Sequence, residues 1–311
     1  MGRYAIRRLL QSIPVLIGIT VIAFILMDIV PGSAVSMMMD PRTAQMSPEV
    51  EARLIAHYGL DDPAPLRYGK FLLNALRGDL GFSLRFNSPV TWIVAERLPS
   101  TALLAASAGT LAVIVGIALG IMAALHRGKF LDSVSMVLAM AGASMPVFWF
   151  GLLLMLLFSV RLGWLPASGW GDGQIQYAIL PALALGYGFA AVIARVTRSS
   201  MLEVLGMDYI TTARSKGLNR RVIVYKHALK NAMIPVITVV GGQVGRLLSG
   251  AVLTETVFAW PGLGRLLVDS ILTRDLPTVQ GCLIVIAVTF VGINLITDLM
   301  YAYLDPRVRF E

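Results

Sequence analysis

The chain has 311 residues, of which 57% are hydrophobic and only 14% are charged, and its formal net charge is +8. Soluble domains carry about 25% charged residues, so this composition excludes an ordinary soluble domain and indicates a protein that crosses a membrane several times. A basic nucleic-acid-binding protein needs a basic face on a soluble domain, with elements that read a groove, and the sequence offers no such segment.

Six apolar runs are long enough to span a bilayer, since a helix needs about 20 residues to cross the hydrocarbon core. They cover roughly Leu9–Val30, Thr101–Leu125, Val134–Val160, Tyr177–Val196, Pro235–Phe258 and Val279–Tyr303. Backbone groups in lipid must be satisfied within their own segment, so each run is predicted to be a helix. The predicted fold class is therefore all-α, a polytopic membrane protein with six transmembrane helices.

The first run begins after three arginines, Arg3, Arg7 and Arg8, as a secretory signal would. The apolar centre of a cleaved signal is typically about 7–15 residues long. This run is longer, which favours an uncleaved signal-anchor over a removed signal peptide.

Lysines and arginines gather in the loops on one side of the predicted spans. Such loops lie in the cytoplasm by the positive-inside rule, so both termini and the basic loop 197–234 are predicted to be cytoplasmic. The net charge is then explained by this bias and by the anionic inner leaflet.

The chain is predicted to have four regions. They are residues 1–30, the cytoplasmic N-terminus and first span; 31–99, an extracytoplasmic segment; 100–303, a five-helix core that includes loop 197–234; and 304–311, a cytoplasmic tail. The extracytoplasmic segment contains two amphipathic stretches, Ser47–His57 and about Leu66–Leu76, and then a loop at Gly78–Ser83. It is large enough for a small cap but not for an independent domain.

A short helix is predicted inside the basic loop, from Asp208, which suits an N-cap, to Gly217, which suits the C-terminal cap. On this helix Ile210, Ala213 and Arg214 share one side. The helix would then form a compact, partly apolar knob presented to the cytoplasm. A solvated basic loop held near anionic lipid fits the same residues, so the pattern alone leaves both interpretations open.

Two charged residues fall inside the fifth apolar run, where an ionisable side chain indicates function by default. Arg246 lies among glycines near the middle of the run and could face a water-filled path and attract a substrate carboxylate, or pair with an acid on a partner subunit. Glu255 lies nearer the outer end, where it could help to gate the path or receive a binding protein, or be an interfacial acid.

The sequence shows no catalytic constellation and no metal-ligand spacing. His57, His126 and His227 are scattered, and no Gly-x-x-x-x-Gly-Lys phosphate loop is present. We therefore predict a chain that is not an enzyme, holds no metal and binds no ATP itself. Cys282, the single cysteine, lies in an apolar run and is expected to pack as a small hydrophobe.

The segment Asp208-Tyr209, Thr212-Ala213-Arg214 and Lys216-Gly217 resembles the cytoplasmic coupling loop of permease subunits in bacterial ABC importers, in the form usual in the oligopeptide/dipeptide branch. Other motifs resemble the same branch in the same order. They include Pro31-Gly32, Leu60–Pro63, Gly78–Gly81, Arg97–Pro99, Trp164–Pro166, Phe258–Gly264 and Asp305–Arg307. The resemblance covers nearly the whole chain and is closest to the B-type permease of a peptide-family importer.

This resemblance implies a type I ABC importer permease fold in the bacterial cytoplasmic (inner) membrane. A second permease would complete the translocation pathway, two ATP-binding subunits would hold ATP and Mg, and an extracytoplasmic binding protein would deliver peptides or glutathione. The residues implied to couple to the ATPase are Asp208, Tyr209, Thr212, Ala213, Arg214, Lys216 and Gly217. A nickel-chelate importer permease and a self-contained channel or secondary transporter remain as alternatives.

Overall fold

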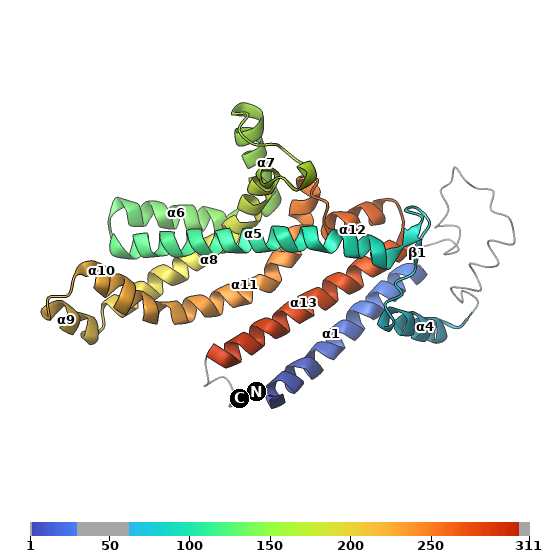
Figure 1. Cartoon of the computed structure of the whole chain (residues 1–311), viewed down its shortest axis with the longest axis horizontal. Coiled ribbons are helices and arrows are strands. Elements are labelled where there is room, and N and C mark those ends of the chain that lie inside the picture. Colours follow the sequence, from blue (N-terminus) through green and yellow to red (C-terminus); the bar gives the residue numbers. More distant parts are fainter. Residues whose placement is uncertain (1, 30–61, 305–311) are drawn as a thin grey trace. The chain divides into compact units, whose positions relative to one another are not determined.

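The computed structural model describes residues 2–29 and 62–304, and its regular structure is almost entirely helical (Figure 1). The chain divides into two compact units. One unit consists of Met1–Thr101 and Pro261–Leu295, and the other of Ala102–Trp260 and Ile296–Glu311. This architecture agrees with the predicted all-α class.

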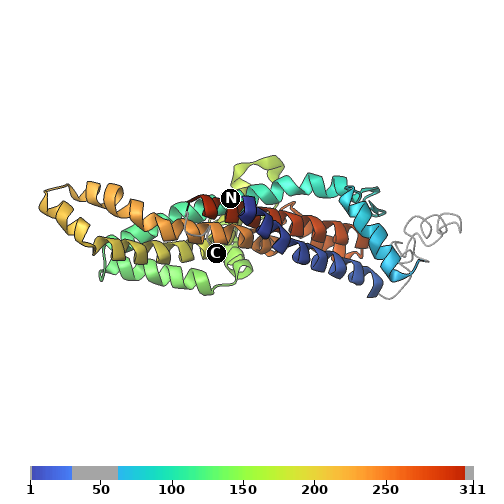
Figure 2. The same ribbon diagram turned by 90° about the horizontal axis from the view of Figure 1, so that it is seen from below.

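The first unit holds the N-terminal helix and most of the C-terminal helix. Its elements are α1 (Gly2–Ile29), α4 (Ala64–Leu76), β1 (Phe82–Ser83), β2 (Ser88–Pro89), the start of α5 (Val90–Leu125), α12 (Leu263–Leu272) and most of α13 (Leu276–Leu304). The two short strands pair antiparallel, with Phe82 opposite Pro89. Helices α1 and α13 run alongside each other (Figures 1 and 2), and Gln280 Nε2 donates to the Ala23 carbonyl at 3.1 Å.

A buried carboxylate organises the start of α13. Asp275 accepts hydrogen bonds from Ser83 Oγ at 2.6 Å and from Thr278 Oγ1 at 2.7 Å. The backbone N–H of Thr278 also points at this carboxylate, as at a helix N-cap. The β1 strand is thereby attached to the first turn of α13.

The second unit is a helical bundle with a small helical extension at one end (Figures 1 and 2). Its elements are the rest of α5, α6 (Phe130–Ser144), α7 (Val147–Leu154), η1 (Met155–Arg161), η2 (Gly171–Gly173), α8 (Ile175–Leu205), α9 (Asp208–Ser215), α10 (Arg220–Val222), η3 (Ile223–Ala228) and α11 (Leu229–Val257). Helix α8 is the centre of this unit, because α6, α7 and α11 all pack against it.

Helices α5 and α8 approach so closely that two glycines are required. A Cβ atom on Gly116 would lie 2.7 Å from Ile193 Cβ, and one on Gly120 would lie 2.5 Å from Thr197 Cβ and 2.7 Å from the Ala194 carbonyl oxygen. Small residues allow helix backbones to come this near in membranes. The Gly116-x-x-x-Gly120 spacing in the sequence is therefore a packing seam between α5 and α8.

Four helices in the described part of the chain are long and apolar enough to cross a membrane, and two bent pairs bring the number to six if each pair counts as one span. The four are Ile6–Ile25, Val90–Leu125, Ile175–Leu205 and Leu276–Leu299. They match four of the six predicted runs, and the fifth run bends by 53° between Arg220–Leu247 and Ala251–Val257.

The predicted third span, Val134–Val160, is not one helix. Helix α6 ends at Ser144, α7 starts at Val147, and the axis turns by 115° between the two halves. Met145 is extended, with φ −79° and ψ 131°. Pro146 explains the break, because proline lacks an N–H group and disfavours helical geometry at the residue before it.

Of the other local predictions, two are confirmed, one is confirmed in part and one lies outside the described residues. The amphipathic stretch Leu66–Leu76 is helix α4, and Cys282 is buried in a hydrophobic cluster with Val90 and Leu263. The loop predicted at Gly78–Ser83 is a loop except for its last two residues, which form β1. The stretch Ser47–His57 lies outside the described residues.

Candidate functional site

The predicted helix in the basic loop is present as α9, and it lies at one end of the second unit beside α10 (Figures 1 and 2). It follows the long helix α8 after a turn at Gly206 and Met207. The chain then returns through α10 and η3 into α11. Helix α9 is therefore connected to α8 on its N-terminal side and, through α10 and η3, to α11 on its C-terminal side.

The two ends of α9 are set by backbone geometry. Gly217 has φ +73°, its N–H donates to the Arg214 carbonyl at 2.9 Å, and the N–H of Leu218 donates to the Ala213 carbonyl at 3.3 Å. This pair of bonds is the Schellman motif, in which glycine takes the left-handed conformation just after the helix. The prediction that Gly217 ends the helix is confirmed.

The prediction for the other end is wrong by one position. Met207 is the N-cap, with extended backbone angles and no side-chain capping bond, and Asp208 is the first helical residue. The carboxylate of Asp208 lies in the first turn, where the partial positive charge of the helix N-terminus favours an anion. Asp208 therefore complements the helix dipole instead of capping the helix.

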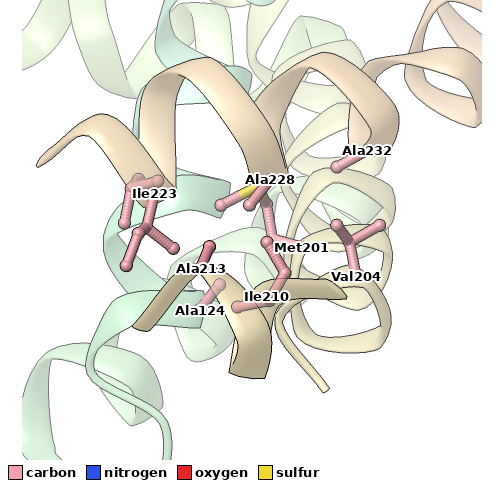
Figure 3. Close-up of a cluster of buried hydrophobic side chains, with 9 residues drawn as sticks. Ala124, Met201, Val204, Ile210, Ala213, Ile223, Ala228 and Ala232 are labelled. Atoms are coloured by element: carbon pink, nitrogen blue, oxygen red, sulfur yellow. The ribbon is translucent and has the colours of Figure 1, made fainter. Parts of the chain in front are cut away.

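One side of α9 attaches the helix to its own unit. Ile210 is fully buried and Ala213 nearly so, and both point into a hydrophobic cluster (Figure 3). The other buried members of the cluster are Ala124, Met201, Val204, Ile223, Val224, Ala228 and Ala232. The expectation of a partly apolar knob, with Ile210, Ala213 and Arg214 on one side, is corrected, because Ile210 and Ala213 face inward whereas Arg214 is exposed.

The opposite side of α9 is open to solvent in this chain. Its exposed residues are Asp208, Tyr209, Thr211, Thr212, Arg214 and Ser215, and exposed Lys216 and Gly217 follow the helix. Of the seven residues predicted to couple, six are therefore exposed, and Ala213 is the buried one. The structure brings all seven together within a single short helix and its C-terminal turn.

Two contacts near α9 were not predicted from the sequence. Asn231 Nδ2, at the start of α11, donates to Tyr209 Oη at 2.7 Å, and Asn219 caps α10 by accepting from the Arg221 N–H at 3.0 Å. The Asn219-Arg220-Arg221 sequence carries an N-cap signal. The link from Tyr209 to Asn231 joins residues 22 positions apart, which local sequence patterns do not reveal.

A hollow of about 480 Å³ lies next to α9. It is lined by Ala124, Leu125, Leu205, Arg214, Leu218, Arg220, Ile223 and Val224. Its apolar lining residues come from the ends of α5 and α8, from the turn after α9 and from η3, whereas Arg214 and Arg220 add positive charge. Two of the positive charges of the basic loop therefore lie at this hollow.

A bidentate ion pair secures the same end of the bundle. Arg198 on α8 donates from Nε to Asp132 Oδ1 at 2.6 Å and from Nη2 to Asp132 Oδ2 at 2.8 Å. The Gly128 N–H donates to the same carboxylate at 3.0 Å. The planar guanidinium matches a carboxylate in this two-point geometry, so the pair fixes the loop after α5 and the start of α6 on α8.

The two charged residues of the fifth apolar run both lie on α11 but differ in burial. Arg246 is exposed in this chain, and Glu255 is fully buried. Arg246 stands 17 residues beyond Leu229, the first residue of α11 (246 − 229 = 17), which is about 25 Å along a helix. The structure therefore does not bring Arg246 and Glu255 into the α9 site.

Within residues 2–29 and 62–304, no three His, Cys, Asp or Glu side chains are grouped so that they would hold a metal ion.

Residues 116–310 match the protein family described as binding-protein-dependent transport system inner membrane component. The whole chain aligns with whole permeases of the same kind. It is 43% identical to the dipeptide transport system permease protein DppB of Alkalihalophilus pseudofirmus, 43% identical to DppB of Escherichia coli K12, and 44% identical to the glutathione transport system permease protein GsiC of Pectobacterium atrosepticum, with 100% of both chains covered in each case.

A solved structure shares the fold. The crystal structure of an amino acid ABC transporter with histidines superposes with a TM-score of 0.54 at 16% identity and covers 68% of this chain and 94% of that chain.

Proposed function

The chain belongs to the inner-membrane components of binding-protein-dependent transport systems, and we propose that it is the permease of an ABC importer that carries dipeptides or glutathione. The relatives that are similar over their full length are named for these two substrates. Both substrates are short peptides with free ammonium and carboxylate groups. The permease itself is a transport component of the membrane and not a catalytic one.

The single observation that carries the coupling proposal is the two-sided construction of α9. Ile210 and Ala213 fasten the helix to the bundle, and its polar side remains exposed. A helix that is fixed on one side and open on the other transmits a push from a bound partner to α8 and α11. We assign this role to Asp208, Tyr209, Thr212, Arg214, Lys216 and Gly217, with Ala213 holding the helix in place.

The complete importer would contain this chain, a second permease, two ATPase subunits and an extracytoplasmic binding protein. ATP and Mg would be held by the ATPase subunits, and this chain would need no cofactor. Both termini and α9 would lie in the cytoplasm, where positively charged loops are favoured. Closure of the ATPase dimer would move α9, and the pathway would then open to the other side of the membrane.

Arg246 and Glu255 are proposed to act along the pathway. Exposed Arg246 either attracts a substrate carboxylate or pairs with an acid on the second permease, and buried Glu255 belongs to the outer part of α11. Replacement of Arg246 by methionine separates the two roles for that residue. Unchanged uptake affinity with a poor yield of assembled complex would assign Arg246 to pairing.

The coupling proposal is tested by reversing one exposed charge in the assembled importer in proteoliposomes. Arg214→Glu should abolish most ATP hydrolysis that is stimulated by the loaded binding protein, together with uptake, while this chain still inserts. The matched control is Arg161→Glu, the same substitution at another exposed arginine, in η1. If Arg214→Glu kept the same ATP hydrolysis and uptake as an active Arg161→Glu variant, the proposed role of α9 would be overturned. Uptake that continues without ATP would favour a self-contained channel or secondary transporter.

The substrate is tested by mass spectrometry of the binding protein purified with its natural ligand. A bound dipeptide or glutathione supports the proposal, and a bound nickel chelate would contradict it.

A further inference from the structure

Helix α4 lies between the first and second predicted spans, and the coupling proposal gives it no role. It has 13 residues, Ala64–Leu76, and none of them is buried, although the structure describes all of them. An isolated helix of this length is only marginally stable in water. The contacts of α4 therefore have to explain why a helix forms here.

One side of α4 packs on α1, and α4 lies beside the C-terminal end of α1 (Figures 1 and 2). The hydroxyls of Tyr68 and Thr20 share a hydrogen bond of 3.0 Å. The Phe24 ring meets the Tyr68 ring edge-on, with centroids 5.5 Å apart, and its centroid lies 6.2 Å from that of Phe71. These contacts fix α4 at the level of Thr20 and Phe24.

That level is close to the end of the membrane span in α1. The span ends at Ile25, five residues after Thr20 and one after Phe24 (25 − 20 = 5; 25 − 24 = 1). Since a helix rises by about 1.5 Å per residue, α4 contacts α1 within about 8 Å of the end of the span. Helices that lie in a membrane surface bury their apolar side about 5–10 Å into the boundary between headgroups and acyl chains. Helix α4 therefore lies at the depth of such a helix.

A second side of α4 is apolar and exposed. Leu66, Leu73 and Leu76 are 51%, 48% and 78% exposed. They are seven and three residues apart along the helix, so they share one side, and this side is not the one that carries Tyr68 and Phe71. A group of exposed apolar side chains marks an interaction surface, so we look for an apolar partner of these leucines.

The surface of α1 next to α4 indicates which partner this is. Ile13 and Ile17 lie on the same side of α1 as Thr20 and Phe24, because the four residues are spaced by three or four positions. Both isoleucines are partly exposed, at 44% and 47%, and only 11% of an 18-residue apolar window of this span is buried within the chain. This side of α1 suits hydrocarbon, and α4 lies on the same side at the end of the span.

Basic side chains flank the leucines. Lys70 and Arg77 are exposed, and each lies four residues after a leucine of the exposed side, Leu66 or Leu73. Lys70 also donates to Asp62 at 2.5 Å. Lysine and arginine beside an apolar helix side extend their stems over it and place their charges at anionic lipid headgroups.

We infer that α4 is a surface anchor, whose three exposed leucines enter the lipid leaflet at the C-terminal end of α1 and whose exposed cations meet lipid phosphates. The partner of α4 is then the membrane surface itself. This role goes beyond the proposed function, since it depends neither on the transported substrate nor on coupling to an ATPase.

The inference is tested by spin labelling of the full importer in liposomes of phosphatidylethanolamine and phosphatidylglycerol. Leu66→Cys, Leu73→Cys and Leu76→Cys are each made in a Cys282→Ala background, which removes the only native cysteine of this chain, and the other subunits are made free of cysteine. The probes are molecular oxygen, which concentrates in lipid, and nickel ethylenediaminediacetate, which stays in water. The matched control is Asn74→Cys, at an exposed polar position of the same helix.

At the three leucine positions we expect oxygen to relax the label more than the nickel compound does, at a depth of about 5–10 Å below the phosphates. At position 74 we expect the reverse order. Leucine positions that are more accessible to the nickel compound would show that α4 stands in water, and the inference would fall. Low accessibility to both probes would also overturn it, because protein, such as the second permease, would then cover the leucines.

The same measurement with the loaded binding protein added excludes another partner. We expect unchanged accessibility at all three leucine positions. If both probes lost access when the binding protein was added, the leucines would belong to its docking surface and not to the membrane.

The contact of Arg77 with lipid phosphate has its own readout. A bimane fluorophore on Leu73→Cys should be quenched about two- to fivefold more strongly by nitroxide-labelled phosphatidylglycerol than by nitroxide-labelled phosphatidylcholine, as expected for about 1 kcal/mol per cation. Arg77→Gln should reduce this preference, and Arg161→Gln, at an exposed arginine in η1, should not. Equal quenching by the two lipids before any change at Arg77 would refute the phosphate contact.

These measurements need neither ATP nor substrate, so their outcome is separate from that of Arg214→Glu. A failed coupling test would leave the lipid contact of α4 standing, and a failed labelling test would leave the coupling result standing.

Discussion

The α5–α8 seam and helix α9 join one helix to another in opposite ways. In the seam, Gly116 and Gly120 contribute no side chain, so the α5 backbone lies directly against Ile193 and Thr197 of α8. In α9, two buried side chains, Ile210 and Ala213, hold the helix on the cluster, and the rest of its surface is exposed. We therefore predict that changes in the seam impair folding, whereas the role proposed for α9 predicts that changes on its exposed side impair coupling.

The largest loss of stability is expected for a substitution that separates α5 from α8 at the seam. In Gly120→Leu, the new side chain meets Thr197 Cβ and the Ala194 carbonyl oxygen, neither of which can move without separating the helices. We expect a loss of at least about 3 kcal/mol of stability. The chain's single cysteine is buried, so a thiol-reactive dye reports the unfolding temperature in detergent.

The control for this substitution is Gly292→Leu on α13, where a Cβ atom meets nothing within 4 Å. If both variants unfolded at the wild-type temperature, the seam would not be the tight contact described here.

The next largest effect is expected for a substitution that weakens the packing of α9 on the bundle and leaves its exposed side chains unchanged. Ile210 is fully buried, and truncation of a buried isoleucine to alanine costs about 2–4 kcal/mol. In Ile210→Ala, hydrogen exchange of the α9 amides should accelerate, and ATPase stimulation should fall even though every exposed residue is unchanged. Thr211→Ala, on the exposed side, is the control, and faster exchange in that variant alone would reverse the assignment of the two sides.

A smaller loss of stability is expected when the ion pair between Asp132 and Arg198 is broken. Asp132→Asn leaves Arg198 without its charged partner. The two side chains are 7% and 27% exposed, so we expect a loss of about 2 kcal/mol, less than for a fully buried pair.

The double variant Asp132→Asn with Arg198→Gln should lose less stability than the sum of the single variants, as measured by thermal unfolding. Additive losses would mean that the two side chains are not coupled.

The sequence predicted much of this structure because membrane helices obey strict local rules. Apolar length locates helices, and glycine after a polar helix marks its end, as at Gly217. The predictions failed where long-range packing or a single proline decides the geometry. The run 134–160 is uniformly apolar, and its hydropathy contains no sign that Pro146 turns the axis by 115°.

The candidate site was predicted in position but not in orientation. The pattern places Ile210 and Ala213 on one side of a helix, but it does not say whether that side faces a partner or the chain itself. That choice depends on Met201, Ile223 and Ala228, which come from neighbouring helices. The pairing of Asp132 with Arg198 likewise joins residues 66 positions apart.

Substitutions of Gly217 are expected to change stability least, and they therefore distinguish an effect on coupling from an effect on folding. Gly217 has φ +73°, and a Cβ atom there would meet nothing within 4 Å, so a substitution acts only through backbone strain. A left-handed conformation costs an L-residue about 1–2 kcal/mol, and asparagine tolerates it better than other residues. Gly217→Val should therefore fray the end of α9, whereas Gly217→Asn should preserve it.

The readout is peptide taken up per ATP hydrolysed by the assembled importer. We expect a lower ratio for Gly217→Val, a nearly normal ratio for Gly217→Asn, and nearly unchanged unfolding temperatures for both, because the strain is confined to an exposed turn. Equal loss of coupling in both variants would mean that a partner contacts this position directly and needs the absence of a side chain. Gly217 would then be required for its lack of a side chain and not for its left-handed conformation.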